Sequence, residues 1–432
     1  MPTPKYYSSR DSDKKLLSFE DALLKGLAPD GGLFLPEFVP RVDPKAWEDA
    51  TSIADIGVAV LYEWLKDEID YKDLEKIVRD ALNFEVPLVS LRDDLTVLEL
   101  FHGPTLSFKD FGARTMARLM QHFLAKRSEK RIILVATSGD TGSAVADGFA
   151  GMDNISVVLL YPKGKVSEVQ ERQLIVKRKG VQALAVKGDF DDCQRMVKEA
   201  FVDKDLAELP LSSANSINIG RLLPQSLYYL WAASQSKTRP LNFCVPSGNL
   251  GNLTSAIIAS LMGLKVDRFI AAHNKNDFFP RFLSGKADAF EFKATVATLS
   301  NAMDVGAPSN FERLFNLLSK DELSEMIWST SVDDEDTIKR MKLAYDNYEY
   351  VACPHTAVGL EAVNRYRKET NDESKFITVA TAHPAKFPEA LSQAIWLELP
   401  RDDSLEALKD EATNVIEINP KLKALKRYLL KK

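Results

Sequence analysis

Six short runs of apolar residues recur between about residue 130 and residue 380, with small-residue loops and helical periodicity between them. Nearly continuous apolar runs that alternate with helices are typical of parallel strands covered on both faces. The runs are Ile132–Ala136, Ile155–Tyr161, Val181–Val186, Leu241–Val245, Val266–Ala272 and Phe376–Ala380. This pattern predicts an α/β fold, in which ligands bind outside the carboxyl ends of the strands. A site is therefore expected in the loops that follow the runs.

The composition of the 432-residue chain excludes several classes of protein. Hydrophobic residues at 45% and charged residues at 27% exclude collagen-like and mainly disordered chains. A net charge of −6 gives no general attraction to nucleic acid or to an anionic membrane. The three cysteines form no CxxC pair and the five histidines no HExxH motif, so we expect no disulfide framework and no metal site. Without an apolar leader or an apolar run of roughly 20 residues, the sequence predicts a cytoplasmic protein.

Other parts of the chain have helical spacing. Phe19–Leu27 and Ile53–Leu65 predict a mainly helical N-terminal part, and residues 319–367 are also expected to be largely helical. Asn419 and Pro420 have the pattern of an N-cap and a first helical residue, and leucines at helical spacing follow them. The lysines of this last helix are compatible with a membrane surface, but we expect the helix to dock on its own protein.

A lysine lies at the predicted start of a helix in the segment from His102 to Phe111. Ser107 and Asp110 have the spacing of a capping box, which predicts that the helix begins at Ser107. Lys109 then lies in the first turn, where its charge opposes the helix dipole. A lysine enclosed there by aromatic neighbours would have a lowered pKa, which suits Schiff-base chemistry. Spacing alone favours the alternative, a surface lysine whose charge Asp110 compensates.

Two loops rich in glycine, hydroxyl and amide side chains follow predicted strands directly. One is Ala136–Ala144 and the other is Pro246–Asn252. Backbone N–H groups and a helix start in such loops favour an anion. The first loop matches neither GxGxxG nor the P-loop, and Asp140 within it suits a carboxylate or a single phosphate better than a polyphosphate. The alternative for such a loop is a tightly packed strand-to-helix turn.

Two further polar segments lie near predicted strand ends or helix starts. Lys165 ends a short turn after the second apolar run. Asn215, Asn218 and Arg221 belong to a segment just before a helix expected near Leu222. The rigid donor fork of an arginine suits a phosphate or a carboxylate. The alternative is a polar turn followed by a surface arginine.

In their order along the chain, these segments resemble the threonine synthase family, in its longer form with an N-terminal extension. The resemblance extends from about residue 5 to residue 390. Six separated motifs carry it: His102-Gly-Pro-Thr-x-x-Phe-Lys-Asp110, Ala136-Thr-Ser-Gly-Asp-Thr-Gly142, Asn215-Ser-Ile-Asn218, Pro246-Ser-Gly-Asn249, Leu299-Ser-Asn-Ala-Met-Asp304 and Thr381-Ala-His-Pro384.

The resemblance implies the α/β fold that the family shares with tryptophan synthase β, called fold type II of the pyridoxal 5'-phosphate (PLP) enzymes. Two lobes with mainly parallel sheets flanked by helices are expected, together with a mainly helical N-terminal domain. The expected boundaries are residues 1–100 for the N-terminal domain, 101–130 and 235–400 for the large PLP-binding lobe, 131–234 for the small lobe and 401–432 for a helical tail.

The resemblance also assigns roles to individual residues. Lys109 is implied to be catalytic and to carry PLP as a Schiff base. The other cofactor-binding residues are Gly248, Asn249, Leu250, Gly251 and Asn252 around the PLP phosphate, and Thr381 at the pyridine nitrogen. The substrate-binding residues are Thr137, Ser138, Asp140 and Thr141 for the α-carboxylate, and Lys165, Asn215, Ser216, Asn218 and Arg221 for the substrate phosphate.

Two of these positions depart from the common pattern of related enzymes. Asp140 stands where they usually have asparagine, although threonine synthases of this form share the aspartate. Because its negative charge opposes direct contact with a carboxylate, backbone donors are expected to do most of that binding. Leu250 replaces a phenylalanine that is common in the phosphate-binding loop, which a grip made by the backbone should tolerate.

The resemblance implies conversion of O-phospho-L-homoserine and water to L-threonine and phosphate by β,γ-elimination and replacement, the last step of threonine biosynthesis. The expected partner is this small substrate, with no nucleic acid and no membrane, in a monomer or a homodimer. One alternative is a PLP-dependent phospholyase that acts on phosphohomoserine or phosphothreonine and gives 2-oxobutyrate. Another is a non-enzymatic metabolite-binding scaffold, against which the retention of Lys109 speaks.

Overall fold

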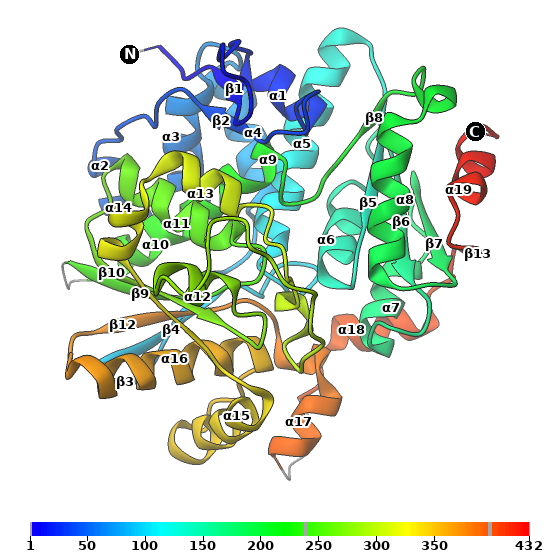
Figure 1. The fold of residues 1–432 in the computed structure, drawn as a ribbon. Helices are drawn as coiled ribbons and strands as arrows, with labels where there is room; N and C mark the ends of the chain where they lie inside the picture. Colours follow the sequence, from blue (N-terminus) through cyan, green and yellow to red (C-terminus); the bar gives the residue numbers. More distant parts are fainter. Residues whose placement is uncertain (1, 237–239, 396–399, 432) are drawn as a thin grey trace.

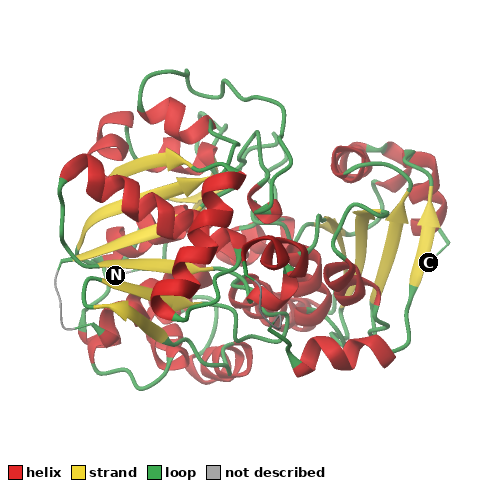
Figure 2. Ribbon diagram, turned by 90° about the horizontal axis from the view of Figure 1, so that it is seen from below, coloured by secondary structure: helices red, strands yellow, loops and turns green. Residues whose placement is uncertain are grey.

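The computed structural model describes residues 2–236, 240–395 and 400–431, which form two α/β lobes and an N-terminal part (Figure 1). Each lobe is built on its own sheet, and the two sheets lie on opposite sides of the molecule (Figure 2). All six predicted apolar runs are strands that pair in parallel. The α/β prediction is therefore confirmed, and so is the division into two lobes with mainly parallel sheets.

The sheet of the large lobe has the order β11-β10-β9-β12-β4-β3, in which only β3 is antiparallel to its neighbour. The two central strands, β9 and β12, are buried along their whole length, as strands covered on both faces must be. The strands are β3 (Leu88–Arg92), β4 (Leu95–Glu99), β9 (Leu241–Pro246), β10 (Val266–His273), β11 (Ile327–Ser331) and β12 (Phe376–Ala380).

Helices connect and cover these strands. Figure 1 shows α16 along one face of the large-lobe sheet and α11 with α10 on the other. The helices after β4 and from residue 227 to residue 394 are α5 (Lys109–Arg127), α10 (Leu227–Gln235), α11 (Gly251–Met262), α12 (Phe278–Leu283), α13 (Phe311–Leu317), α14 (Lys320–Met326), α15 (Asp334–Tyr348), α16 (Pro354–Thr370) and α17 (Pro388–Ala394).

The sheet of the small lobe has the order β13-β7-β6-β5-β8 and is parallel throughout. Its strands are β5 (Arg131–Ala136), β6 (Ile155–Pro162), β7 (Val181–Val186), β8 (Leu211–Ser212) and β13 (Val415–Ile418). The helices of residues 140–222 and of the C-terminal segment are α6 (Asp140–Gly148), α7 (Glu168–Ile175), α8 (Phe190–Val202), α9 (Ile219–Leu222), α18 (Asp403–Ala407) and α19 (Leu422–Leu429).

The N-terminal part combines helices with a short antiparallel pair of strands. Its elements are β1 (Tyr6–Ser8), β2 (Phe34–Pro36), α1 (Phe19–Lys25), α2 (Lys45–Glu48), α3 (Ile53–Leu65) and α4 (Tyr71–Ala81). Helices α1 and α4 pack against α5, so the N-terminal part contacts the helix that begins at Lys109. Short 3-10 turns elsewhere are η1 (Lys204–Leu206), η2 (Leu223–Ser226), η3 (Asn301–Met303), η4 (Pro384–Lys386) and η5 (Leu408–Asp410).

Two expected boundaries differ from the observed sheets. Strands β3 and β4 precede residue 100 but belong to the large-lobe sheet, because β4 pairs in parallel with β12. The segment expected to be a helical tail, 401–432, also contains β13, which extends the small-lobe sheet by pairing with β7. Three of the four residues of this edge strand are apolar, but the run is shorter than the six apolar runs, is interrupted by Glu417 and is mostly exposed. Residues 237–239, 396–399 and 432, which fall in the expected large lobe and tail, lie outside the described residues.

The C-terminal helix docks on the small lobe, as expected. Helix α19 packs against α8, and the side chains of Leu425 and Leu429 join the apolar core behind β6 and β7. The helix begins at Leu422 rather than just after Asn419, because Lys421 before it has an extended backbone (φ −134°, ψ 135°). The Pro420 carbonyl outside the helix accepts a hydrogen bond from Arg195 Nη2 at 2.9 Å. Within the described ranges, no helix is both long and apolar enough to cross a membrane.

We expect Leu425→Ala to lower the free energy of unfolding by about 2–5 kcal/mol, because it leaves a cavity under α19. Urea unfolding followed by circular dichroism measures the change. The matched control is Leu430→Ala, since Leu430 is 56% exposed one residue beyond the helix. Its effect should stay within about 0.5 kcal/mol. Equal effects of the two substitutions would contradict a docked helix.

Candidate active site

Loops from three neighbouring parallel strands meet at the carboxyl edge of the large-lobe sheet. The segment after β4 runs antiparallel beside the segment after β12, where Ser107 pairs with Ala382. The Phe108 amide donates to the Thr381 carbonyl at 2.9 Å, and the His383 amide donates to the Leu106 carbonyl at 3.0 Å. These bonds place Lys109 next to Thr381. The next strand in the sheet, β9, ends at the loop 247–252.

Helix α5 begins at Lys109, so the predicted start at Ser107 is wrong. The expected capping box does not form, because the Asp110 carboxylate accepts from the Thr105 amide at 2.9 Å and from the Thr105 hydroxyl at 2.6 Å. Burial raises the pKa of Asp110 to about 6 against these hydrogen bonds. Asp110 therefore fixes the loop before the helix instead of capping the helix through Ser107.

The environment of Lys109 lowers the pKa of its amine to about 8. Burial is the main cause, since it penalises the charged form. Asp140 opposes this shift, whereas the cations Lys386 and Arg221 add to it. Lys109 Nζ also lies 5.9 Å from the centre of the Phe108 ring. The interpretation of Lys109 as a surface lysine is therefore wrong, because the side chain is partly buried among charged and aromatic groups.

The loop after β9 requires glycine at one position and a left-handed backbone at another. A Cβ on Gly248 would lie 2.6 Å from the Met303 Cα, so no larger residue fits there. Leu250 has φ +60° and precedes Gly251, the first residue of α11. The Asn249 amide bonds both ways, to the Ser216 hydroxyl at 2.6 Å and from the Ser309 amide at 2.5 Å. Asn249 thus joins this loop to two other segments of the chain.

The same loop offers donors to an anion. The first N–H groups of α11 have no acceptor within the helix. Asn252 accepts from the hydroxyls of Tyr228 and Tyr229 at 2.5 and 2.6 Å, which leaves its buried Nδ2 without a hydrogen-bond partner among the described residues. A backbone cradle with free donors, one strand away from Thr381 and two from the segment before Lys109, fits the phosphate of PLP.

The loop after β5 places Asp140 at the start of α6. Its carboxylate contacts a lysine there, whereas its neighbours were expected to bind the substrate carboxylate. The buried Thr137 hydroxyl accepts from the amides of Gly139 and Gly142 at 3.0 and 2.8 Å, so it shapes the loop. Ser138 and Thr141 are half-buried. The fully buried Lys386 holds the Asp140 carboxylate at 2.7 Å.

The loop Asn215–Asn218 lies against the cradle, and Arg221 follows it at the core of α9. The buried Arg221 donates from Nη1 to the Ala214 carbonyl at 2.9 Å, while its Nε has no hydrogen-bond partner in the described part of the chain. Burial lowers the pKa of Arg221 to about 10, so the guanidinium stays charged at neutral pH. Asn215 Oδ1 is also buried and unpaired within these residues. Arg221 Nε lies against α5, where a Cβ on Gly112 would come within 3.0 Å of it, and the Ser216 hydroxyl accepts from Asn249 of the cradle.

Two predicted substrate-binding residues stand apart from this group. Asn218 is buried and fully engaged: it caps α9 through the Gly220 amide and donates to the carbonyls of Leu23 and Ser213. It therefore shapes the loop. Lys165 is exposed in the turn after β6. The structure thus brings Arg221 and Ser216 into the buried site and leaves Lys165 at the surface.

Sequence reasoning gave no role to several residues that hold the site together. Gln170 donates to Asp140 at 3.0 Å, and Lys386 donates to the Thr105 carbonyl at 2.8 Å. The buried Arg313 donates to the Ser216 carbonyl at 3.3 Å and to Asn310 at 2.7 Å, which fixes the loop beside the cradle. Lys386 lies two residues after the motif Thr381–Pro384, which is a signal for it, but no local pattern marks Gln170 or Arg313.

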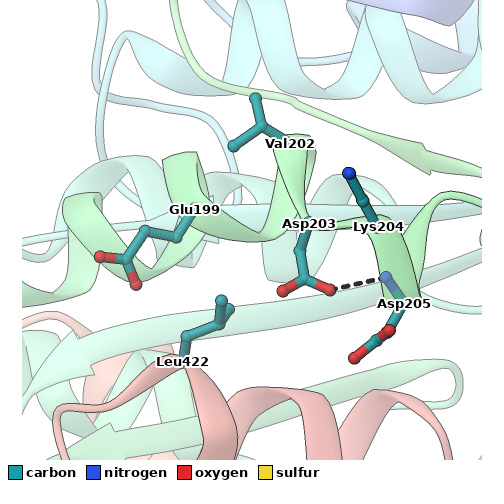
Figure 3. Close-up of a pocket in the computed structure, with 6 residues that line it drawn as sticks. All are labelled: Glu199, Val202, Asp203, Lys204, Asp205 and Leu422. Carbon is teal, nitrogen blue, oxygen red and sulfur yellow. Dashed lines mark hydrogen bonds between the residues drawn. The ribbon is translucent and has the colours of Figure 1, made fainter.

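Two hollows in the surface lie outside this site. One, of about 480 Å³, lies between α8, η1 and α19 on the small lobe (Figure 3). Lys426 pairs there with Asp203 and Asp205, and no predicted site residue lines the hollow. The other, of about 660 Å³, borders two segments: residues 401–404 and the loop 102–106, which precedes Lys109. The second hollow therefore reaches the outer side of the loop that Asp110 fixes.

Comparisons with known proteins agree along the whole chain. Family models described as threonine synthase N terminus, pyridoxal-phosphate dependent enzyme and threonine synthase, C-terminal match residues 5–82, 87–382 and 356–429. Threonine synthase of Haemophilus influenzae is 39% identical over 425 residues, which cover 96% of this chain and 97% of that protein. The crystal structure of PLP-bound threonine synthase from Brucella melitensis matches with TM-score 0.92 and 34% identity over 99% of both chains. Threonine synthase from yeast matches with TM-score 0.91 and 32% identity over 99% of this chain and 98% of that one.

Proposed function

Because this chain belongs to the threonine synthase family and is a PLP-dependent lyase, we propose that Lys109 binds PLP and that the site converts O-phospho-L-homoserine and water to L-threonine and phosphate. The observation that carries the proposal is the meeting of Lys109, Thr381 and the Gly248 cradle at three adjacent strand ends. A partly buried lysine with a lowered pKa beside a phosphate-binding loop suits a cofactor held by a Schiff base.

The segments after β4, β9 and β12 are assigned to the cofactor. Gly248, Asn249, Leu250, Gly251 and Asn252 are assigned to its phosphate, and Thr381 to its pyridine nitrogen. A neutral hydroxyl at that nitrogen stabilises added electron density less than a carboxylate would, which helps to control where protons return. Bound there, PLP supplies the electron-withdrawing group that makes protons on the substrate carbons acidic.

Lys109 is assigned the proton transfers. Since its pKa is about 8, a fraction of the amine is neutral near pH 7 and can take the proton from Cα of the substrate and then one from Cβ. The protonated amine can return a proton at Cγ after phosphate has left. Asp140 and the two nearby cations set how readily this nitrogen gains and loses its proton.

The substrate is assigned to the two polar loops. Ser216, Asn215 and Arg221 are placed at its phosphate, with Asn218 holding the shape of their loop and Lys165 joining from the small lobe. The loop Thr137–Thr141 is placed at the α-carboxylate, which backbone amides at the start of α6 and Ser138 can bind. The phosphate, once released, lies beside Arg221 and can act as the base for the water that attacks Cβ.

Incubation with O-phospho-L-homoserine in the presence of PLP tests the function. We expect L-threonine and phosphate in equal amounts. Accumulation of 2-oxobutyrate in place of threonine would identify a phospholyase on the same scaffold, and absence of any PLP binding would identify a non-enzymatic scaffold. The phospholyase shares every cofactor contact above, so the product decides between the two enzymes.

The lowered pKa of Lys109 predicts how fast the apoenzyme captures PLP at different pH values. A lower pKa makes the neutral amine available at lower pH, so the rate should rise about tenfold per pH unit up to about pH 8 and then level off. An ordinary lysine would continue to gain rate to about pH 10.5. Stopped-flow absorbance measures the rate, and Nα-acetyl-lysine amide is the control that corrects for the ionisation of PLP itself. A profile parallel to that of the free amine would contradict the prediction.

The location and the oligomeric state of the protein have no direct bearing on this chemistry. The three cysteines are buried and unpaired, which supports a reducing compartment and hence a cytoplasmic location. A monomer or a homodimer is the expected oligomeric state.

A further inference from the structure

Lys386 is a buried cation that contacts a carboxylate of the other lobe and a backbone carbonyl of its own lobe. Its side chain is 0% exposed, and it lies in η4, just after β12 of the large lobe. Its Nζ contacts Asp140 Oδ1 of the small lobe at 2.7 Å and donates to the Thr105 carbonyl at 2.8 Å. Asp140 in turn is 3% exposed in its side chain. Each of these two buried charges needs the other, because water does not reach either ion to solvate it.

Glutamines of α7 extend this contact on the small-lobe side. Gln170 Nε2 donates to Asp140 Oδ1 at 3.0 Å, and its Oε1 accepts from Asn301 Nδ2 at 3.4 Å. Gln173 Nε2 donates to the same Thr105 carbonyl that Lys386 contacts, at 3.2 Å. The bonds therefore join α6 and α7 of the small lobe to three segments of the large lobe, namely the loop before α5, η3 and η4.

The charge at Asp140 poses a physical problem for the loop in which it lies. The loop 137–141 is assigned to the negatively charged carboxylate of the substrate, yet it contains a buried carboxylate of its own. Two carboxylates at such a site repel each other, and burial strengthens the repulsion. Lys386 removes this obstacle, since it neutralises Asp140 and Gln170 takes up the same oxygen.

We propose that Lys386 is a positioning residue: by holding Asp140 across the interface between the lobes, it cancels the negative charge of the loop Thr137–Thr141 and keeps that loop shaped to receive the substrate carboxylate. The proposal rests on the assignment of this loop under the proposed function. Lys386 does not touch the reacting atoms in this role. It acts through Asp140, and it also lies close enough to Lys109 to influence its protonation.

A pair of ligands isolates the role of the carboxylate. O-phospho-L-homoserine carries an amine, a phosphate and a carboxylate, whereas 3-aminopropyl phosphate carries the same amine and phosphate without the carboxylate. Binding of each to the PLP-loaded protein is measured from the first change in visible absorbance after rapid mixing, before phosphohomoserine is consumed. The variants are Lys386→Met, Asp140→Asn and the two combined, because the double variant removes both charges while nearly keeping the side-chain volumes.

We expect Lys386→Met to weaken binding of phosphohomoserine by about 100-fold and binding of 3-aminopropyl phosphate by no more than about threefold. The double variant should recover at least about tenfold of the loss for phosphohomoserine, because the uncompensated carboxylate is gone. Equal losses for the two ligands, or a double variant no better than Lys386→Met, would show a purely structural ion pair and overturn the proposal.

The wild-type protein separates this proposal from the one on which it depends. If the wild type binds the two ligands equally well, the loop does not receive a carboxylate and its assignment fails. If the wild type prefers phosphohomoserine and Lys386→Met keeps the full preference, the assignment holds and the role of Lys386 is wrong.

A second readout follows the proton on the Lys109 nitrogen. The charged groups that act on it are Asp140, Lys386 and Arg221, and the buried His355 faces the same groups, with a pKa that burial lowers to about 4. Lys386→Met removes a cation and frees Asp140, so the pH midpoint of the visible absorbance should rise, whereas Asp140→Asn should lower it. An unchanged midpoint in both variants would contradict the placement of the pair beside Lys109. A protein that only lost packing would show a lower melting temperature without these opposite shifts.

Discussion

Lys109→Ala is expected to lower the rate of threonine formation by about four orders of magnitude or more, because it removes both the attachment of PLP and the base. The variant should also lose the visible absorbance of lysine-linked PLP. Little else should change, since Lys109 makes no hydrogen bond recorded within the described ranges and lies at the first turn of α5. Phosphohomoserine turnover and an absorbance spectrum measure the two effects.

Lys126→Ala is the matched control for this experiment. Lys126 is exposed in the last turn of the same helix, so the same substitution there should leave turnover and absorbance unchanged. Melting temperatures of both variants show whether α5 stays folded. Near-normal turnover by Lys109→Ala would remove Lys109 from the mechanism.

Arg221→Ala should raise the KM for O-phospho-L-homoserine by about 100-fold while PLP still binds, because a buried charge-assisted contact to the substrate phosphate is lost. The guanidinium is positioned by a single bond from Nη1 to the Ala214 carbonyl, and its Nε is left without a partner in the residues that the structure describes. Steady-state kinetics and the PLP spectrum together distinguish loss of substrate from loss of cofactor.

Arg221→Lys tests the geometry of the same contact. It keeps the charge but loses the planar fork, so we expect it to recover only part of the affinity. Arg195→Ala, at a surface arginine of α8, controls for removal of a positive charge anywhere on the small lobe. Saturation kinetics of Arg221→Ala equal to those of the wild type would exclude Arg221 from the phosphate site, and loss of PLP as well would make its role structural.

The parallel strands were predictable because they are buried on both faces. Each of β5, β6, β7, β9, β10 and β12 coincides with an apolar run, since a strand in the middle of a covered sheet has no polar side. The strands at the edges of the two sheets were not predictable in this way. Strand β13 has mostly exposed side chains, and β11 includes serine and threonine. Pairing with β7 and with β10 orders these two strands.

The site could be predicted in part for a related reason. Glycine at 248 and small residues at 137–142 are local requirements of tight strand-to-helix loops, so they are visible in the sequence. The capping box at Ser107 and Asp110 is equally local but does not form, because Thr105 takes both oxygens of the carboxylate. A local pattern names the groups available, and competition among neighbours decides which bond forms.

The amino-acid pattern was enough to predict the fold class and the small-residue loops at the strand ends, and the order of its motifs was enough to indicate the family. Those features depend on periodicity and on residues close together in the chain. Only the tertiary structure decided that Lys386 neutralises Asp140, that Asn218 is engaged in shaping its loop, and that Lys165 is exposed. Such outcomes depend on desolvation and on partners from distant segments, and these exist only once the two lobes have folded against each other.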